Sequence, residues 1–145
     1  MTERAEKAVS LFDEGFSCSQ AVLAAFADLF GLGYNHALKI AQPFGGGIAH
    51  RGEMCGAVSG AFMAIGLKYG RIRAEDIEAR EKTYEKVQQF INLFLNSHET
   101  LLCRGLLGVD LSQPGVYEKA NEDKIFSTIC PKIIQSATEF LEEIL

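Results

Sequence analysis

The sequence has no long apolar run and no extended basic patch, since its one small group of basic residues, at positions 68–73, is followed at once by acidic ones, and each absence excludes a class of protein. Its most apolar stretch, residues 57–67, is too short to span a bilayer and is interrupted by glycines. The first residues are charged and amphipathic, without the apolar segment of a secretory signal. Acidic residues outnumber basic ones, 19 to 14, which disfavours nucleic acid as a partner. We therefore expect a cytoplasmic protein that neither inserts into a membrane nor binds nucleic acid.

Several motifs that identify a chemistry are also missing. The four cysteines form no C-x-x-C pair and no C-x-x-C-H haem attachment site, which argues against thioredoxin-like sites, zinc ribbons and haem. There is no H-E-x-x-H metal motif and no hydrolase triad. The glycine run Gly45-Gly46-Gly47 lacks the preceding strand and the following Gly-Lys-Ser/Thr of a nucleotide-binding loop.

Helical periodicity extends along most of the chain, and no segment alternates as a strand would. Apolar spacing, caps and glycines predict longer helices over residues 2–14, 18–30, 53–69 and 74–96, and from Cys130 to the last residue. They predict shorter helices over residues 35–41, 101–107 and 116–123. We predict an all-α fold in which residues 1–145 form a single domain, a bundle of four to five main helices plus short helices.

The helix predicted over residues 53–69 is apolar nearly all round, so we expect it at the centre of the bundle. Gly52, Gly56, Gly60 and Ala64 fall at every fourth residue and line one face of it. Because glycine has no Cβ, such a face lets another backbone or a bulky group approach closely. Gly56 is therefore a candidate for contact with a cofactor.

The four cysteines are the residues most able to carry chemistry. A cytosolic domain of this size does not depend on structural disulfides. All four are predicted at helix N-termini: Cys18 follows the cap Ser17, Cys55 lies in the first turn of the central helix, Cys103 follows Thr100 as a cap, and Cys130 precedes Pro131. The helix dipole and free N–H groups stabilise a thiolate there.

One helix is predicted between each successive pair of cysteine-bearing helices, so the four cysteine-bearing helices run in the same direction. Their N-termini, and with them the cysteines, should meet at one end of the bundle. The alternative is that the cysteines are inert, because free cysteine also behaves as a small buried apolar residue.

Two sequence features near the cysteines could contribute to a functional site that the four thiols form. The backbone of Gly45, Gly46 and Gly47 could approach it and donate N–H bonds to sulfur, or the glycines could simply form a turn. His50, five residues before Cys55, could move protons, bind a metal or orient a partner, or it could be an ordinary solvated loop residue.

The segment GFSCSQAV, the pattern GGG…CGAVSGA and two further lone cysteines resemble the redox-active family named for its C_GCAxxG_C_C motif. The resemblance runs from Cys18 to the last helix, and residues 55–60 fit the form CGAxxG. It implies redox activity based on the cysteines. A related domain in some multi-haem electron-transfer proteins has cysteines linked to an iron–sulfur cluster, but the resemblance leaves the reaction open.

The leading hypothesis is a small redox-active protein whose four cysteines act together, with an unidentified redox partner protein. The cysteines could bind an iron–sulfur cluster or another metal for electron transfer, or they could cycle between dithiol and disulfide. We favour a bound metal slightly, because four converging thiolates repel one another unless a cation compensates. The alternative hypothesis is a non-enzymatic module, zinc-bound or cofactor-free, that binds a partner. Whether the protein is an enzyme, and its oligomeric state, remain open at this point.

Overall fold

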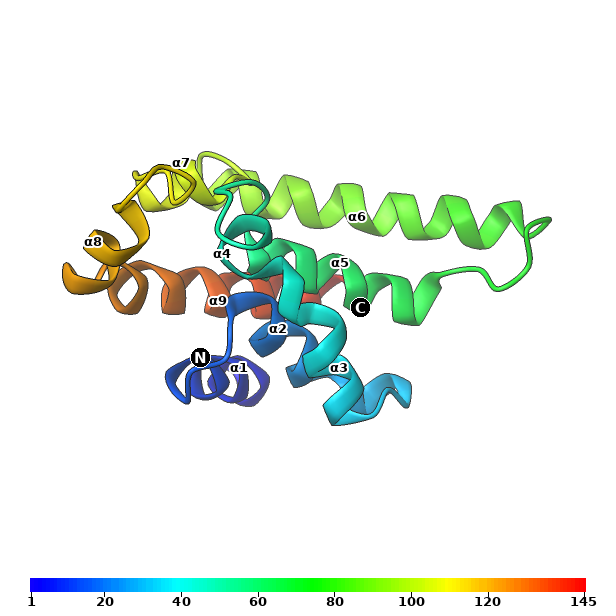
Figure 1. Ribbon diagram of the computed structural model, residues 1–145. Coiled ribbons are helices and arrows are strands. Elements are labelled where there is room, and N and C mark those ends of the chain that lie inside the picture. The colour runs from blue at the N-terminus through cyan, green and yellow to red at the C-terminus, as the bar shows by residue number, and fades with distance from the viewer.

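Helices make up nearly all the regular structure, and the computed structural model describes residues 1–145 (Figure 1). The main helices are α1 (Glu3–Asp13), α2 (Cys18–Phe26), α5 (Gly56–Tyr69), α6 (Ile77–Ser97) and α9 (Ile125–Ile144). The short elements are η1 (Ala27–Phe30), α3 (Tyr34–Ala41), η2 (Gln42–Phe44), α4 (Gly45–Ile48), α7 (Cys103–Leu107) and α8 (Val116–Glu122). The predicted all-α bundle with four to five main helices is confirmed. No helix combines the length and apolarity that a membrane span requires.

Helices α2 and α5 pack against each other at the centre of the molecule, with α5 buried along most of its length. A Cβ at Gly56 would lie 3.1 Å from the Ser19 nitrogen, and one at Gly60 would lie 2.8 Å from the Ser19 oxygen. The absence of side chains at these two positions lets the two backbones meet. The close approach predicted for the glycine face is therefore confirmed at Gly56 and Gly60, whereas Gly52 lies before the helix begins.

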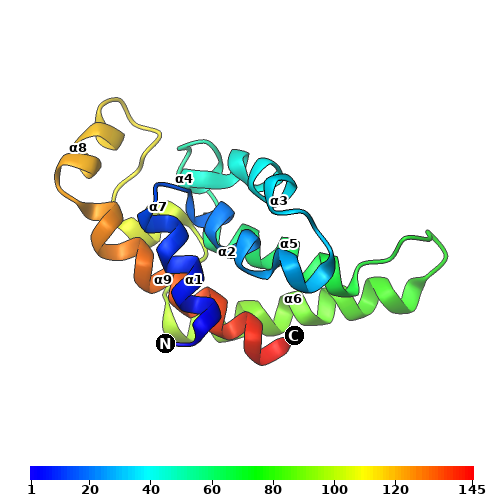
Figure 2. The same cartoon turned by 90° about the horizontal axis from the view of Figure 1, so that it is seen from below.

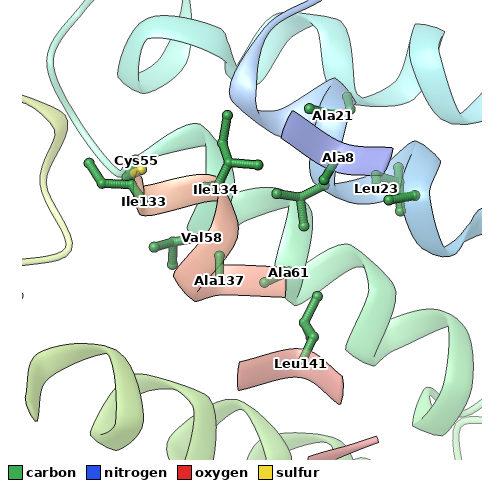
Figure 3. Packing of buried hydrophobic residues seen from close by; sticks show 14 of the residues in the cluster. Ala8, Ala21, Leu23, Cys55, Val58, Ala61, Ile133, Ile134, Ala137 and Leu141 are labelled. Atoms are coloured by element: carbon green, nitrogen blue, oxygen red, sulfur yellow. The ribbon is translucent and has the colours of Figure 1, made fainter. Parts of the chain in front are cut away.

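Helix α9 joins the two sides of the molecule, because it packs against α1 and α2 on one side and against α5 and α6 on the other (Figure 2). Its apolar face places Ile134, Ala137 and Leu141 near Val58 and Ala61 of α5 (Figure 3). The long helix α6 covers α5 and extends beyond it. Helices α7 and α8 pack against α9, and α4 packs against α2, α5 and α7 (Figure 1).

The predicted start of the last helix was wrong. Helix α9 begins at Ile125, after Lys124 in a left-handed conformation (φ 58°), so Cys130 lies inside the helix and not at its N-terminus. Ile125 and Ile129 pack against the core and continue the apolar face of the helix. Pro131 has no N–H and therefore cannot donate a hydrogen bond to the preceding turn. The free energy gained by packing the two isoleucines outweighs the loss of this one bond.

Three other helices begin two to three residues later than predicted. Helix α5 begins at Gly56, because residues 53–55 extend alongside residues 101–103 and form a single antiparallel bridge between Met54 and Leu102. The cap of α7 is Leu102 and not Thr100, whose hydroxyl instead accepts from the Leu102 N–H at 3.1 Å. Helix α6 begins at Ile77, after the cap Asp76.

Candidate functional site

A cavity of about 920 Å³ opens at the end of the molecule where α4, α7 and α8 meet the first turns of α2 and α9. Three of the four cysteines, Cys18, Cys103 and Cys130, line its wall. Cys55 is buried and is not among the lining residues; like Ile133 of α9 it belongs to the hydrophobic core (Figure 3). The cavity therefore gives a ligand access to three thiols, of which Cys18 is the most exposed.

Cys18 is held at the first position of α2 by a capping box. The Ser17 hydroxyl accepts from the Gln20 backbone N–H at 3.4 Å, and the Gln20 side chain accepts from the Ser17 N–H at 2.9 Å. The Gln20 amide also donates to the Leu38 carbonyl at 3.0 Å, which ties this end of α2 to α3. The N-terminal position predicted for Cys18 is thus confirmed, and its backbone is fixed from two directions.

The pKa of the Cys18 thiol is lowered from its ordinary value, chiefly by a hydrogen bond from the Cys130 thiol. Burial opposes this effect, and backbone N–H groups of residues 18, 46 and 57 add to it. Residue 57 lies in the first turn of α5, so the N-termini of two helices contribute to stabilising the thiolate. Among the four cysteines, Cys18 is the one that ionises first.

The other three thiols have raised pKa values. Burial raises the pKa of Cys103 to about 12, with the Cys18 charge as the second cause. The pKa of Cys55 is also raised, mainly by burial and to a smaller extent by the Cys18 charge. The pKa of Cys130 is raised mainly because its proton is held in the hydrogen bond to Cys18. One thiolate surrounded by three protonated thiols avoids the repulsion that four thiolates would create.

Cys55 and Cys103 are brought together by backbone hydrogen bonds between the segments that precede α5 and α7. The Cys55 N–H donates to the Leu101 carbonyl at 2.8 Å, and the Cys103 N–H donates to the Glu53 carbonyl at 2.7 Å. Cys55 is the cap of α5 and Cys103 is the first residue of α7. The structure thus gathers all four cysteines in one region, although only three of them lie at a helix start.

The segment that follows η2 is a left-handed turn. Residues 46 to 50 all have φ between 48° and 68°, including the non-glycine residues Ile48, Ala49 and His50. Left-handed backbone costs a non-glycine residue about 1–2 kcal/mol. The turn is closed by hydrogen bonds such as that from the Glu53 N–H to the Gly47 carbonyl at 2.9 Å.

The three glycines of this turn pack directly against the site. A Cβ at Gly45 would lie 2.7 Å from the Ser17 Cβ, and a Cβ at Gly47 would lie 2.7 Å from the Cys103 Cβ. The backbone of Gly46 supplies one of the N–H groups that lower the pKa of Cys18. The glycines therefore form a turn and also bring backbone to sulfur; their role toward a cofactor stays a prediction, as does that of Gly56.

His50 lies at the end of the turn and lines the cavity. Its ring is exposed and stacks on Tyr117 of α8, with ring centroids 4.0 Å apart and planes inclined by 22°. Tyr117 in turn contacts Phe126 of α9, at 5.4 Å between centroids. No sequence pattern singles out Tyr117, because one aromatic residue on a short helix has no periodic signal of its own, and Phe126 is one of many apolar residues of α9.

The four thiols have the donor chemistry of a zinc or iron–sulfur site. As they stand in the structure, however, no group of three cysteine, histidine or carboxylate side chains is arranged to hold a metal ion. A metal ion or cluster held by the four cysteines therefore stays a prediction. All four cysteines are free thiols.

The fold and the cavity define an all-α domain with four gathered cysteines, one of which is poised to ionise. The model of a family described as "Putative redox-active protein (C_GCAxxG_C_C)" matches residues 16–144, and the chain belongs to this family. The family resemblance inferred from the cysteine pattern is thereby confirmed. Searches of curated proteins and of solved structures gave no match.

Proposed function

We propose that this protein is a dithiol–disulfide redox protein in which Cys18 attacks a substrate disulfide and Cys130 resolves the intermediate. The observation that carries the proposal is that Cys18 and Cys130 both line the cavity wall, where Cys130 is the largest cause of the lowered pKa of Cys18. A thiolate is the attacking species in thiol–disulfide exchange, and Cys18 is the thiol whose pKa is lowered.

The reaction has two exchange steps. The Cys18 thiolate attacks one sulfur of the substrate disulfide, whose S–S bond breaks, and one substrate thiolate leaves with the electron pair. The Cys130 thiol then loses its proton to the departing thiolate or to water and attacks the Cys18 sulfur. A Cys18–Cys130 disulfide forms and the second substrate thiolate is released. The substrate gains two electrons, and a reducing dithiol partner returns two electrons to the protein by the reverse steps.

The pKa of Cys130 favours this order of events. In the reduced protein the pKa of Cys130 is raised first by its hydrogen bond to Cys18, second by burial and third by the Cys18 charge. Once Cys18 is bonded to substrate, it carries no charge and no longer accepts that proton. Cys130 therefore ionises more readily after the first step than before it. As a result, Cys18 and Cys130 are not thiolates at the same time. A cycle of this kind suits a reducing compartment, and we place the protein in the cytosol.

An iron–sulfur cluster or another metal bound by Cys18, Cys55, Cys103 and Cys130 stays the second candidate. The observation in its favour is that charges on the four cysteines influence one another, so the four sulfurs share one region. Zinc in a non-enzymatic partner-binding module is the further alternative. Iron, sulfide and zinc analysis of protein purified without oxygen tests both: stoichiometric metal would replace the dithiol proposal, and metal-free protein would support it.

The dithiol proposal is tested with variants of the two cysteines and a small neutral disulfide. We expect Cys130→Ser to form a long-lived mixed disulfide at Cys18, because no resolving thiol remains, and Cys18→Ser to form none. The products are identified by intact-protein mass spectrometry after reaction and acid quenching.

Cys55→Ser is the matched control, because Cys55 lies outside the cavity wall. This variant should still complete both steps and release two thiols for each disulfide consumed. Mixed-disulfide formation at Cys103 in preference to Cys18, or release of both thiols by the Cys130→Ser variant, would overturn the assignment.

A further inference from the structure

The wall of the cavity carries no lysine, arginine, aspartate or glutamate. Away from the cysteines, its only titratable side chains are His50 and Tyr117. This lack of charge is unusual for the molecule, in which 33 of 145 residues are acidic or basic. A charged substrate group would therefore lose hydration in the cavity and would meet no charged side chain there other than the Cys18 thiolate. An acidic group would also be repelled by the Cys18 thiolate.

Aromatic rings occupy much of the same wall. Phe12 and Phe16 come from α1 and the α1–α2 connection, Tyr117 comes from α8 and Phe126 comes from α9. All four are only partly buried, so part of each ring is exposed where it can be covered by a ligand. Burying apolar surface against such rings is favourable and gives geometric preference through ring stacking.

Uncharged hydrogen-bonding groups complete the wall. The side chains of Gln42 and Asn121 are exposed amides that line the cavity from η2 and α8. Amides can both donate to and accept from a peptide backbone without adding charge. A volume of about 920 Å³ lies within the range of ordinary small-ligand sites, which is large enough for a short peptide segment but not for a folded domain.

From these features we infer the substrate class of the proposed exchange reaction: a peptide disulfide whose cysteine is flanked by an apolar, preferably aromatic, residue. The flanking side chain packs among Phe16, Tyr117 and Phe126, the peptide backbone bonds to the amides, and the disulfide faces Cys18. This inference rests on the proposed function. It goes further by excluding acidic thiol compounds as preferred substrates.

The test compares symmetric disulfides of four acetylated dipeptide amides, Phe-Cys, Ala-Cys, Glu-Cys and Lys-Cys, with the reduced full-length protein. The second-order rate constant of thiol release is measured for each and divided by that for a simple thiol such as 2-mercaptoethanol, which removes intrinsic differences between the disulfides. We expect the Phe peptide to react at least about tenfold faster than the Ala peptide, the size of effect that an apolar pocket gives. The Glu peptide should be slowest.

Two variants locate the effect in the cavity. Tyr117→Ala should reduce the preference for Phe over Ala to less than about threefold, with Tyr84→Ala, an exposed tyrosine on α6, as the matched control. Asn121→Asp replaces an exposed amide and should slow the Glu peptide and speed the Lys peptide. The second variant keeps the test valid if Tyr117→Ala does not fold.

The outcomes separate the two proposals. No exchange with any peptide would overturn the proposed function itself. Exchange at equal normalised rates with all four peptides, or the fastest rate with the Lys peptide, would overturn the inference about the cavity and leave the dithiol cycle standing.

Discussion

Cys18 differs from the other three cysteines in the groups that surround its sulfur. It is the only one of the four that receives a hydrogen bond from another thiol, and the backbone N–H groups of two helix N-termini are directed at it. Burial acts on all four thiols and by itself raises a thiol pKa. At Cys18 the hydrogen bonds outweigh burial, at Cys55 burial outweighs the backbone hydrogen bonds, and at Cys103 burial and neighbouring negative charges both raise the pKa.

Replacing Cys130 by alanine should raise the pKa of Cys18, because the largest cause of its lowering is lost. Alkylation of Cys18 by iodoacetamide would then become several-fold slower at neutral pH, and its pH profile would shift to higher pH. Peptide mass spectrometry gives the rate for each cysteine. Cys55→Ala is the control, because Cys55 is not among the groups that lower the Cys18 pKa. An unchanged profile in the Cys130 variant would contradict the hydrogen-bond assignment.

Among the elements, the turn that contains α4 determines how closely the backbone approaches the cysteines. Its left-handed residues continue past the two glycines to Ile48, Ala49 and His50. The glycine run in the sequence predicts a turn there. Nothing in the sequence predicts that the three non-glycine residues that follow also have a positive φ. The turn ends at residues 52 and 53, whose carbonyls accept long-range hydrogen bonds from the N–H groups of residues 104 and 103, and local sequence does not reveal these contacts.

Gly47→Ala should destabilise the protein by more than Gly31→Ala does. Both glycines have φ near +70°, so each substitution costs about 1–2 kcal/mol in backbone strain. At Gly31 a new Cβ would meet nothing within 4 Å, whereas at Gly47 it would lie 2.6 Å from the Glu53 nitrogen and 2.7 Å from the Cys103 Cβ. Urea unfolding measures the difference in the free energy of unfolding. Equal losses for the two variants would mean that the turn does not pack against Cys103 as described.

The elements also show why some helix starts could be predicted and others could not. Ser17 with Gln20 forms a capping box that identifies the start of α2 from the sequence, and the structure contains it. Pro131 predicted a helix start for an equally sound local reason. That expectation failed because Ile125 and Ile129 gain more from packing on the core than the helix loses at the proline.

In the whole molecule, the cysteines converge because four separate chain segments meet at one end of the bundle. The alternation of helix directions predicted this convergence, and it did not depend on the exact start of α9. The aromatic lining of the cavity was beyond prediction, since Phe12 is far from Tyr117 and Phe126 in the chain and only the packing of α1, α8 and α9 brings the three together.

The stability of the reduced protein should fall as the pH rises above about 8.5, the ordinary pKa of a thiol in an unfolded chain. Cys103, with a pKa of about 12, keeps its proton in the folded protein while the unfolded chain loses it, so each pH unit costs about 1.4 kcal/mol. Cys55 and Cys130 act in the same direction. The lowered pKa of Cys18 has the opposite effect and raises the free energy of unfolding. This gain stops growing once the pH exceeds the pKa that the thiol has in the unfolded chain.

Urea unfolding from pH 7.5 to 10 under reducing conditions measures this dependence. Cys103→Ala should show a shallower decline than the unmodified protein, since one of the thiols responsible is gone. Parallel declines in the two proteins would show that Cys103 ionises in the folded state as easily as in the unfolded one.

The most direct measurement of the central claim is to identify the first disulfide that the protein forms. The reduced full-length protein is treated with one equivalent of a small neutral disulfide, quenched with acid, alkylated and mapped by peptide mass spectrometry. The account predicts a Cys18–Cys130 bond, with Cys55 and Cys103 recovered as alkylated thiols. A first disulfide between Cys55 and Cys103, or no intramolecular disulfide at all, would contradict it.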